Sequence, residues 1–348
     1  MTTNGGSLVT ERPKTKIAVL SFAHPHAIGY CRLLAARDDV ELLTTDPDGA
    51  TAGDAAPRGA DLAGMLGVPY AESYAEALAW APDAVVVTAE NARHRELVEL
   101  AAGAGAHILC EKPLATTVDD AKAMVAAAEL AGVTLMTAYP VRFAASFVDA
   151  RDRVRAGQLG TIIGVKGTNN GKIPLADRSW FTDETLSGGG SLVDHVVHCA
   201  DLLDELFGAL PTSVRAVSNR MLHADSGVTV ETGGMVTAIY PGGVVATIDC
   251  SWSVPDSSPT WGGVTLQITG TKGRLTIAPF VQHVRGYDAA GEIWESVGDD
   301  LDRAMLAEFL AAVRDGRTAT PDGRVGVRTL QVVDAAQRSV RSGQPILL

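Results

Sequence analysis

The sequence is poor in cysteine, in basic residues and in long apolar runs, and each shortage excludes a class of protein. Only four of the 348 residues are cysteines, and no two form a C-x-x-C pair, so we expect reduced thiols in a cytoplasmic protein. The 29 basic residues against 41 acidic ones give a net charge of −12, which argues against nucleic acid as a partner. No apolar run approaches the ~20 residues that span a bilayer. The N-terminus also lacks the apolar core of a secretory signal, so no membrane partner is expected.

The first part of the chain alternates short apolar segments with helical patterns. We expect strands at 17–23, 40–46, 83–89, 107–113 and 133–139, and helices at 27–37, 61–66, 73–80, 96–104 and 118–132. Repeated βα units with short connections predict a parallel, doubly wound sheet. Ligands of such sheets bind beyond the carboxyl ends of the strands. We therefore predict a flexible tail at 1–14 and a Rossmann dinucleotide-binding domain at 15–139.

The second part of the chain has a different pattern. Strand-like segments with glycine-rich turns occur at 161–170, 213–222, 228–241, 244–254, 264–270 and 274–279, and helices are expected at 144–156, 191–207, 301–314 and 326–341. Such segments are typical of antiparallel strands. The predicted fold class is thus α/β: an N-terminal Rossmann sheet, then an α+β domain at 140–348 with an open, mostly antiparallel sheet.

The turn after the first strand, SFAHPHA, lacks the three glycines of a G-x-G-x-x-G dinucleotide turn. Ser21, Ala23 and His26 stand in their places, although a helix N-terminus still follows to receive phosphate. Asp46 ends the second strand, 25 residues after Ser21. An acid there can bind ribose hydroxyls and repel a 2′-phosphate, which favours NAD over NADP. The alternative is that Asp46 is an ordinary turn residue before Pro47.

His24 and His26 have a spacing found in metal-dependent hydrolases with a barrel fold. Such a barrel needs eight βα units, and this chain has about five. Zinc would also need further ligands from elsewhere. We therefore expect no metal, and interpret the two histidines either as lining a cofactor or substrate pocket or as part of a structural loop.

Two further motifs carry side chains suited to chemistry. Lys112 of Glu-Lys-Pro ends the fourth strand, where an ammonium can polarise a substrate oxygen; it is otherwise a solvated lysine. In GGGSLVDHVVHCAD (188–201), Asp194 and His198 share one helix face. A carboxylate one turn before a histidine can orient it as a general base; the pair is otherwise a surface ion pair. His195 and Cys199 are expected to be packing residues.

Together these motifs resemble the glucose–fructose oxidoreductase/inositol dehydrogenase (Gfo/Idh/MocA) family from about Lys16 to Leu348. The resemblance rests on VVVTAENARHREL (85–97), ILCEKPLA (108–115), the GGG helix, GTKGRLTI (270–277) and the closing AAQRSVRSGQPILL. It implies hydride transfer between a nicotinamide and a hydroxyl-bearing carbon of a sugar, cyclitol or related polyol, and a homodimer or homotetramer formed through the second sheet. It also implies catalytic roles for Lys112, Asp194 and His198.

The cofactor and substrate positions follow from the motifs and the resemblance. Cofactor contacts are expected from Ser21, Phe22, Ala23, His24, His26, Asp46, Thr88, Glu90, Asn91, His94, Glu111 and Lys112. Ala89 and Glu90 depart from the family's Thr-Pro, which places a carboxylate near the expected nicotinamide. Candidate substrate residues, each with a surface or core alternative, are Arg142, Asn169, Asn170, Lys172, Arg178, Trp180 and His198.

Three functions remain open on sequence alone. The first is an NAD-dependent dehydrogenase of a polyol, sugar or cyclitol, with NADP a less favoured cofactor. The second is a glycosidase or lyase that retains NAD without net redox turnover. The third is a ligand-sensing protein of the same fold without catalysis, motivated by SFAHPHA.

Overall fold

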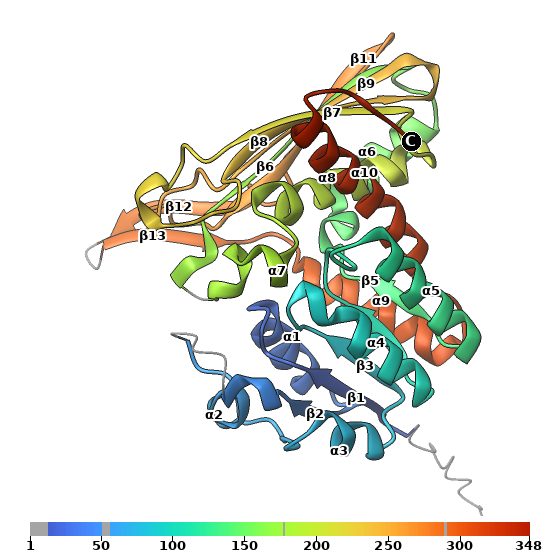
Figure 1. Ribbon diagram of the computed structural model, residues 1–348, viewed down its shortest axis with the longest axis vertical. Coiled ribbons are helices and arrows are strands. Elements are labelled where there is room, and N and C mark those ends of the chain that lie inside the picture. The colour runs from blue at the N-terminus through green and yellow to red at the C-terminus, as the bar shows by residue number, and fades with distance from the viewer. Residues whose placement is uncertain (1–12, 51–55, 177, 289–290) are drawn as a thin grey trace, which may run out of the picture.

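The computed structural model describes residues 13–50, 56–176, 178–288 and 291–348, so nearly all of the expected tail at 1–14 lies outside the described residues. Two lobes, each built on one sheet, make up the molecule (Figure 1). Within the described ranges, no helix is both long and apolar enough to cross a membrane.

The first lobe contains a five-stranded sheet in which every neighbouring pair is parallel, as predicted. The strands are β1 (Thr15–Leu20), β2 (Val40–Thr45), β3 (Ala84–Val87), β4 (His107–Cys110) and β5 (Leu135–Thr137), in the order β2-β1-β3-β4-β5. The helices are α1 (His26–Ala35), α2 (Gly59–Leu66), α3 (Tyr74–Ala79), α4 (His94–Gly103) and α5 (Val118–Ala131). The chain places β2 on one side of β1 and then β3, β4 and β5 on the other side, so the strand order reverses between β1 and β3. Such a reversal is where doubly wound folds bind ligands.

Both faces of this sheet are covered, which explains its nearly continuous apolar strands. Ala18 and Leu20 pack with α4 and α5, whereas Ile17 and Val19 point to the opposite face and pack with α1. That second face is completed from the far end of the chain, by Met305, Leu306, Phe309 and Leu310 of α9 (Leu301–Asp315). In Figure 1, α9 accordingly lies against the first lobe.

The second lobe is built on a seven-stranded sheet in the order β11-β10-β6-β9-β8-β7-β14. Its strands are β6 (Ile162–Gly171), β7 (Ser213–Asn219), β8 (Gly233–Tyr240), β9 (Val244–Ser251), β10 (Gly262–Gly270), β11 (Gly273–Ile277) and β14 (Ile346–Leu347). Only β6 and β9 pair in parallel, so the mostly antiparallel sheet is confirmed. The hairpin of β12 (His283–Asp288) and β13 (Gly291–Ser296) was not predicted.

One face of the second sheet is covered by helices. These are α8 (Ser191–Phe207) and α10 (Gly323–Ser342), while α6 (Ala145–Arg155) and the short α7 (Glu184–Ser187) lie nearby. α10 also packs on α5, so it joins the two lobes (Figure 1).

Candidate active site

Lys112 and Asp194 meet where the two lobes join. Lys112 follows β4 and precedes a cis peptide bond to Pro113, and Asp194 lies in the first turn of α8. The Nζ atom of Lys112 is 2.7 Å from Asp194 Oδ1, and both residues are nearly buried. The structure therefore brings together two of the three residues that the sequence marks as catalytic, in a buried ion pair rather than at the surface.

Asp194 does not orient His198, contrary to the expectation from their spacing. Its second carboxylate oxygen, Oδ2, lies 3.1 Å from His195 Nε2 and accepts a 3.3 Å hydrogen bond from Trp252 Nε1. Burial alone would raise the pKa of Asp194, but Lys112 and His195 hold it well below its usual range. The tertiary contact with Lys112 thus determines where this carboxylate points.

His195 was expected to be a packing residue, and the structure corrects this. Its Nδ1 atom lies 2.9 Å from the carbonyl oxygen of Asn169 on β6, while Nε2 faces Asp194. The side chain therefore links the Asp194 carboxylate to the second sheet. Its position next to Asp194 was the only sequence signal for this role.

His198 lies one helical turn after Asp194 and faces the same space. Burial and the nearby Lys112 ammonium lower the pKa of His198 well below its usual value. Its Nδ1 atom is buried and has no hydrogen-bond partner among the described residues. The side chain is thus a neutral imidazole at the wall of a cavity, which suits a proton acceptor.

A cavity of about 560 Å³ joins these residues. Its walls include Lys112, Asp194 and His198, the two histidines of the first turn, and Asn169 and Lys172 of the second lobe. Sequence reasoning missed several other lining residues, among them Phe181, Trp261, Phe280 and Asp302. The volume falls within the usual range for small-molecule sites.

Three of the seven expected substrate residues, Asn169, Lys172 and His198, line the cavity, and the other four have contacts elsewhere. Asn169 donates to the His195 carbonyl, and its Oδ1 has no hydrogen-bond partner in the part of the chain that the structure describes. Lys172 Nζ donates to the carbonyls of Asp256 and Ser258. Arg142 instead binds Asp201 and Glu205 of α8, at 2.6 and 2.5 Å. Asn170 accepts a hydrogen bond from Ser251. The guanidinium of Arg142 therefore serves the packing of α8, because its buried charge is taken up by these carboxylates.

Arg178 and Trp180 reach back to the first lobe. Arg178 donates to the carbonyls of Phe22 and Pro57, and Trp180 Nε1 donates to the carbonyl of Ala23 at 3.0 Å. Trp180 stacks on Phe181, and Phe181 lines the cavity. Of the two alternatives for Trp180, a sugar platform or a core residue, the structure favours the second, because the buried ring covers the turn after β1.

The turn after β1 uses most of its own amide groups. The N–H groups of Ala23, His24, His26 and Ala27 donate to the Ser21 hydroxyl, the Thr88 carbonyl, the His24 ring and the His24 carbonyl. Pro25 has no N–H group. Compared with a glycine turn, few amides remain to receive a diphosphate.

Asp46 ends β2 as expected, but a neighbour that the sequence did not mark holds it. Arg58 lies 2.8 Å from Asp46 Oδ1 and 3.0 Å from Glu90 Oε1, and all three side chains are buried. Ser21 and the Gly59 amide also donate to Asp46. Arg58 follows the 47–57 stretch, and nothing in the sequence around it predicts a contact with Asp46 at the end of β2.

The other expected cofactor residues divide into structural and available groups. The ring of His94 lies between the turns after β3 and β4, with Nε2 3.1 Å from the Ala89 carbonyl oxygen and Nδ1 3.1 and 3.2 Å from those of Pro113 and Leu114. Thr88 donates to the Ser21 carbonyl. By contrast, Oε2 of Glu90 and Oδ1 of Asn91 are buried without a hydrogen-bond partner among the described residues, as is the hydroxyl of Thr45.

The glycines before α8 serve close packing. An added Cβ at Gly190 would lie 2.0 Å from the Glu231 carbonyl oxygen. Glu231 in turn accepts hydrogen bonds from the amides of Gly190 and Leu192, so its carboxylate caps α8. This cap explains why β8 begins only at Gly233, later than the strand expected from residue 228.

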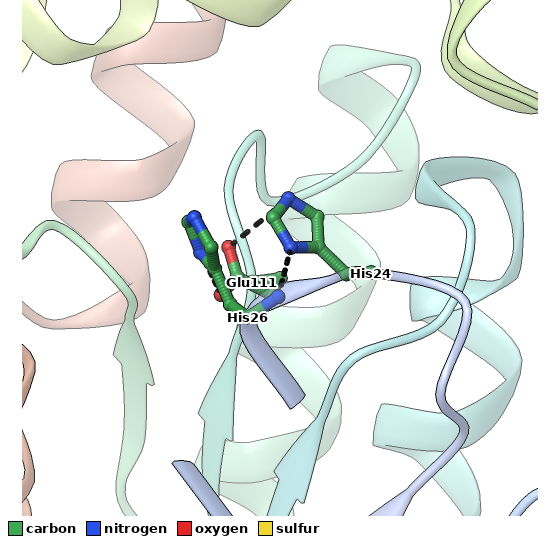
Figure 2. Close-up of side chains that lie close together, drawn as sticks. All are labelled: His24, His26 and Glu111. Atoms are coloured by element: carbon green, nitrogen blue, oxygen red, sulfur yellow. Dashed lines mark hydrogen bonds and ion pairs between the residues drawn. The ribbon is translucent and has the colours of Figure 1, made fainter. Parts of the chain in front are cut away.

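The pair His24 and His26 converges on Glu111 (Figure 2). His26 Nδ1 lies 2.9 Å from Glu111 Oε1, and Tyr30 donates to the same oxygen at 2.6 Å. Burial opposes protonation of His26, but the Glu111 carboxylate outweighs it and raises the pKa of His26. Both histidines line the cavity.

Comparisons with known proteins agree with this architecture. Residues 48–139 match the model of an oxidoreductase family with an NAD-binding Rossmann fold, and residues 147–276 match that of the GFO/IDH/MocA C-terminal domain. The chain is 31% identical over 298 residues to the 1,5-anhydro-D-fructose reductase of Ensifer adhaerens, covering 83% of this chain and 87% of that protein. It is 30% identical over 302 residues to the D-xylose 1-dehydrogenase (NADP(+)) 2 of Haloferax volcanii, covering 84% and 89%.

Solved structures show the same fold over the whole length. The crystal structure of GenD2 from gentamicin A biosynthesis, in complex with NAD, superposes with a TM-score of 0.84 at 24% identity, covering 100% of this chain and 99% of that one. The aldose-aldose oxidoreductase of Caulobacter crescentus, complexed with glycerol, gives 0.76 at 26% identity, covering 96% and 100%.

Proposed function

Because the chain belongs to the Gfo/Idh/MocA family of NAD(P)-dependent oxidoreductases, we propose that Lys112, Asp194 and His198 carry out its hydride-transfer chemistry. The substrate is a sugar, cyclitol or related polyol, oxidised at a hydroxyl-bearing carbon or reduced at the corresponding carbonyl. The observation that carries the assignment is the convergence of these three side chains on one cavity. The comparisons do not favour a glycosidase, lyase or non-catalytic sensor.

The residues at the carboxyl edge of the first sheet fit a nicotinamide dinucleotide. Thr45, Glu90 and Asn91 follow or end β2 and β3, and each leaves a buried polar atom without a hydrogen-bond partner among the described residues. Buried polar groups normally have partners, and ribose hydroxyls or a carboxamide supply them. When bound, the nicotinamide accepts or donates the hydride.

The protein's own residues handle the proton and the developing charge. His198, neutral because of burial, takes the hydroxyl proton on its imidazole ring at the cavity wall during oxidation. Lys112 places its ammonium against the reacting oxygen and stabilises negative charge there. Asp194 fixes Lys112 at 2.7 Å, and His195 and Trp252 hold Asp194 in turn.

We further propose NAD rather than NADP as the preferred cofactor. Asp46 and Glu90 share the single guanidinium of Arg58, so the local charge stays negative and disfavours a 2′-phosphate. In a titration followed by tryptophan fluorescence, NADH should bind at least about tenfold more tightly than NADPH, a difference of ~1.4 kcal/mol. Equal or tighter binding of NADPH would reverse this assignment.

The function is tested with a panel of polyols and carbonyl sugars. Given its relatives, the panel includes 1,5-anhydro-D-fructose for reduction and D-xylose and inositols for oxidation. We expect NAD(H)-linked turnover that His198→Asn abolishes without loss of cofactor binding. Turnover that survives this substitution would remove His198 from its role.

Assembly and location are also proposals. Val217 and Met235 are paired across β7 and β8 and, with Val245 of β9, they expose apolar side chains on the sheet face away from α8. This face supports a homodimer or homotetramer, which sedimentation of the protein would reveal. The four buried, free cysteines support a cytoplasmic location.

A further inference from the structure

Three side chains with metal-binding atoms meet at the carboxyl edge of the first sheet. His24 lies in the turn after β1, His26 begins α1 and Glu111 follows β4 (Figure 2). Their nearest ligand atoms all lie within 4.8 Å of one another. We propose that they bind a divalent transition-metal ion such as Zn²⁺, a site that goes beyond the oxidoreductase function and does not depend on it.

The distances suit a single ion. Zinc bonds of ~2.0–2.2 Å in tetrahedral geometry place two ligand atoms roughly 3.4 Å apart. His26 Nδ1 is 2.9 Å from Glu111 Oε1, and His24 Nε2 is 3.9 Å from Glu111 Oε2. The two separations run to different oxygens of Glu111 and lie on either side of the ideal value, so side-chain movements are needed to complete the geometry. Two imidazoles and one carboxylate are also a ligand set found in catalytic zinc sites.

His24 provides a separate reason for a bound cation. Its Nε2 atom is buried, faces Glu111 and has no hydrogen-bond partner among the described residues. Its Nδ1 atom accepts the amide hydrogen of His26 at 3.2 Å, which places the ring proton on Nε2 in the metal-free chain. An ion at Nε2 gives this nitrogen a partner. The ring proton then moves to Nδ1, and the hydrogen bond from the His26 amide is lost. Metal binding should therefore change the environment of the first turn of α1.

The surroundings hold Glu111 in place for coordination. Tyr30 donates to Oε1 at 2.6 Å, and the backbone N–H of Lys112 donates to Oε2 at 3.1 Å. Such outer contacts orient ligands and strengthen metal sites. Lys112 directly follows Glu111, and its ammonium would repel a bound metal ion, but Asp194 neutralises this charge. Asp302 adds a carboxylate to the same cavity wall.

The site faces the catalytic cavity. His24 and His26 line it together with Lys112, Asp194 and His198. Three protein ligands leave a fourth position open, as in catalytic rather than structural zinc sites. Its occupant from the cavity is a water molecule or a hydroxyl oxygen of the substrate.

The test measures metal binding by the full-length protein without any assay of turnover. After treatment with a chelator, the protein is titrated with ZnSO₄ by calorimetry and with Co²⁺ by visible absorption, which reports tetrahedral coordination. We expect one ion per chain with a sub-micromolar dissociation constant and a tetrahedral cobalt spectrum. A full-length protein that binds less than one ion per chain, or shows no saturable binding, would overturn the site.

The variants are chosen to keep the fold. His24→Asn keeps an acceptor for the His26 amide but removes Nε2, and Glu111→Gln is nearly isosteric. Each should weaken Zn²⁺ binding at least about 100-fold, since even outer-shell changes cost 10–100-fold. His223→Asn is the matched control, because His223 lies outside the cluster at a positive φ that asparagine tolerates. Wild-type affinity in both cluster variants, with circular dichroism showing them folded, would assign the ion to other residues.

Discussion

Two of the three buried aspartates of helix α8, Asp194 and Asp201, lie seven residues apart and have environments with opposite effects. Asp194 faces the cavity and has two basic neighbours, Lys112 and His195, which hold its pKa well below the usual range. Asp201 has only Arg142 as an ionic partner among the described residues, and it shares Arg142 with Glu205. Burial therefore prevails and raises the pKa of Asp201 to about 6.

The two aspartates thus illustrate a proposed catalytic use and a structural use of the same side chain. Where basic groups outnumber carboxylates, as at Asp194, the site can stabilise negative charge on a substrate oxygen. Where carboxylates outnumber the cation, as at Asp201, the cluster joins α8 to the segment before α6. Burial and an ion pair alone do not identify a catalytic carboxylate, because both residues have them.

The strongest test removes the cation of the catalytic cluster. Lys112→Met should lower kcat at least about 10²–10³-fold, since a preorganised charge at the reacting oxygen is lost. Steady-state kinetics on the best substrate of the panel measures this. Lys122→Met, an exposed lysine on α5, serves as control and should keep full activity. A loss of less than tenfold in Lys112→Met would mean that another group stabilises the charge.

The equivalent change in the structural cluster should affect stability instead. Arg142→Met leaves the buried Asp201 carboxylate without its ionic partner, which typically costs about 3–5 kcal/mol. Urea denaturation measures the loss, and kcat per folded molecule should stay near that of the wild type. If unfolding is unchanged but kcat falls sharply, Arg142 would belong to the substrate site, as the sequence first suggested.

The two aspartates should also respond oppositely to pH. The folded-state pKa of Asp201 is raised, so its contribution to stability is present below about pH 4 and is lost as pH rises to about 6. Asp201→Asn should therefore gain about 2–3 kcal/mol relative to wild type between pH 4 and 7. Denaturation curves across this range measure the gain, and a difference that does not vary with pH would contradict it.

Asp194 gives the matching experiment with the reverse sign. Its folded-state pKa is lowered, so its contribution is present above about pH 4 and is lost at lower pH. The stability advantage of wild type over Asp194→Asn should hold constant from pH 5 to 8 and shrink below pH 4. An advantage that grows on acidification would show that Asp194 is not held ionised.

The smallest expected effect concerns Trp252, which donates to Asp194 at 3.3 Å. Trp252→Phe keeps most of the packing and removes one long hydrogen bond, worth about 1 kcal/mol. A fall in kcat of about fivefold, with unchanged cofactor affinity, is expected. Trp80→Phe, beside Lys16 in the first lobe, is the control. Equal kinetics in the two variants would show that the indole N–H does not position Asp194.

The strands of the first sheet were predicted well, because buried parallel strands are almost entirely apolar. Helix α8 was also predicted well, because the sequence marks both of its ends clearly. The partners of the site residues were harder to predict. The spacing of Asp194 and His198 correctly places both on one face of α8, but Lys112 and His195 decide where the carboxylate points. Arg58 reaches Asp46 only through tertiary folding. Likewise, the amphipathic pattern of α9 predicts that one side of this helix is buried, but it does not predict which of the two sheets that side packs against.

The position of α9 has a consequence for biosynthesis. Residues 305–310 supply part of one face of the sheet that residues 15–137 begin. A ribosome must therefore complete nearly the whole chain before the nucleotide-binding lobe can bury its core. A fragment ending near residue 140 would expose the apolar side chains that α9 covers, so the two lobes depend on one another from synthesis onward.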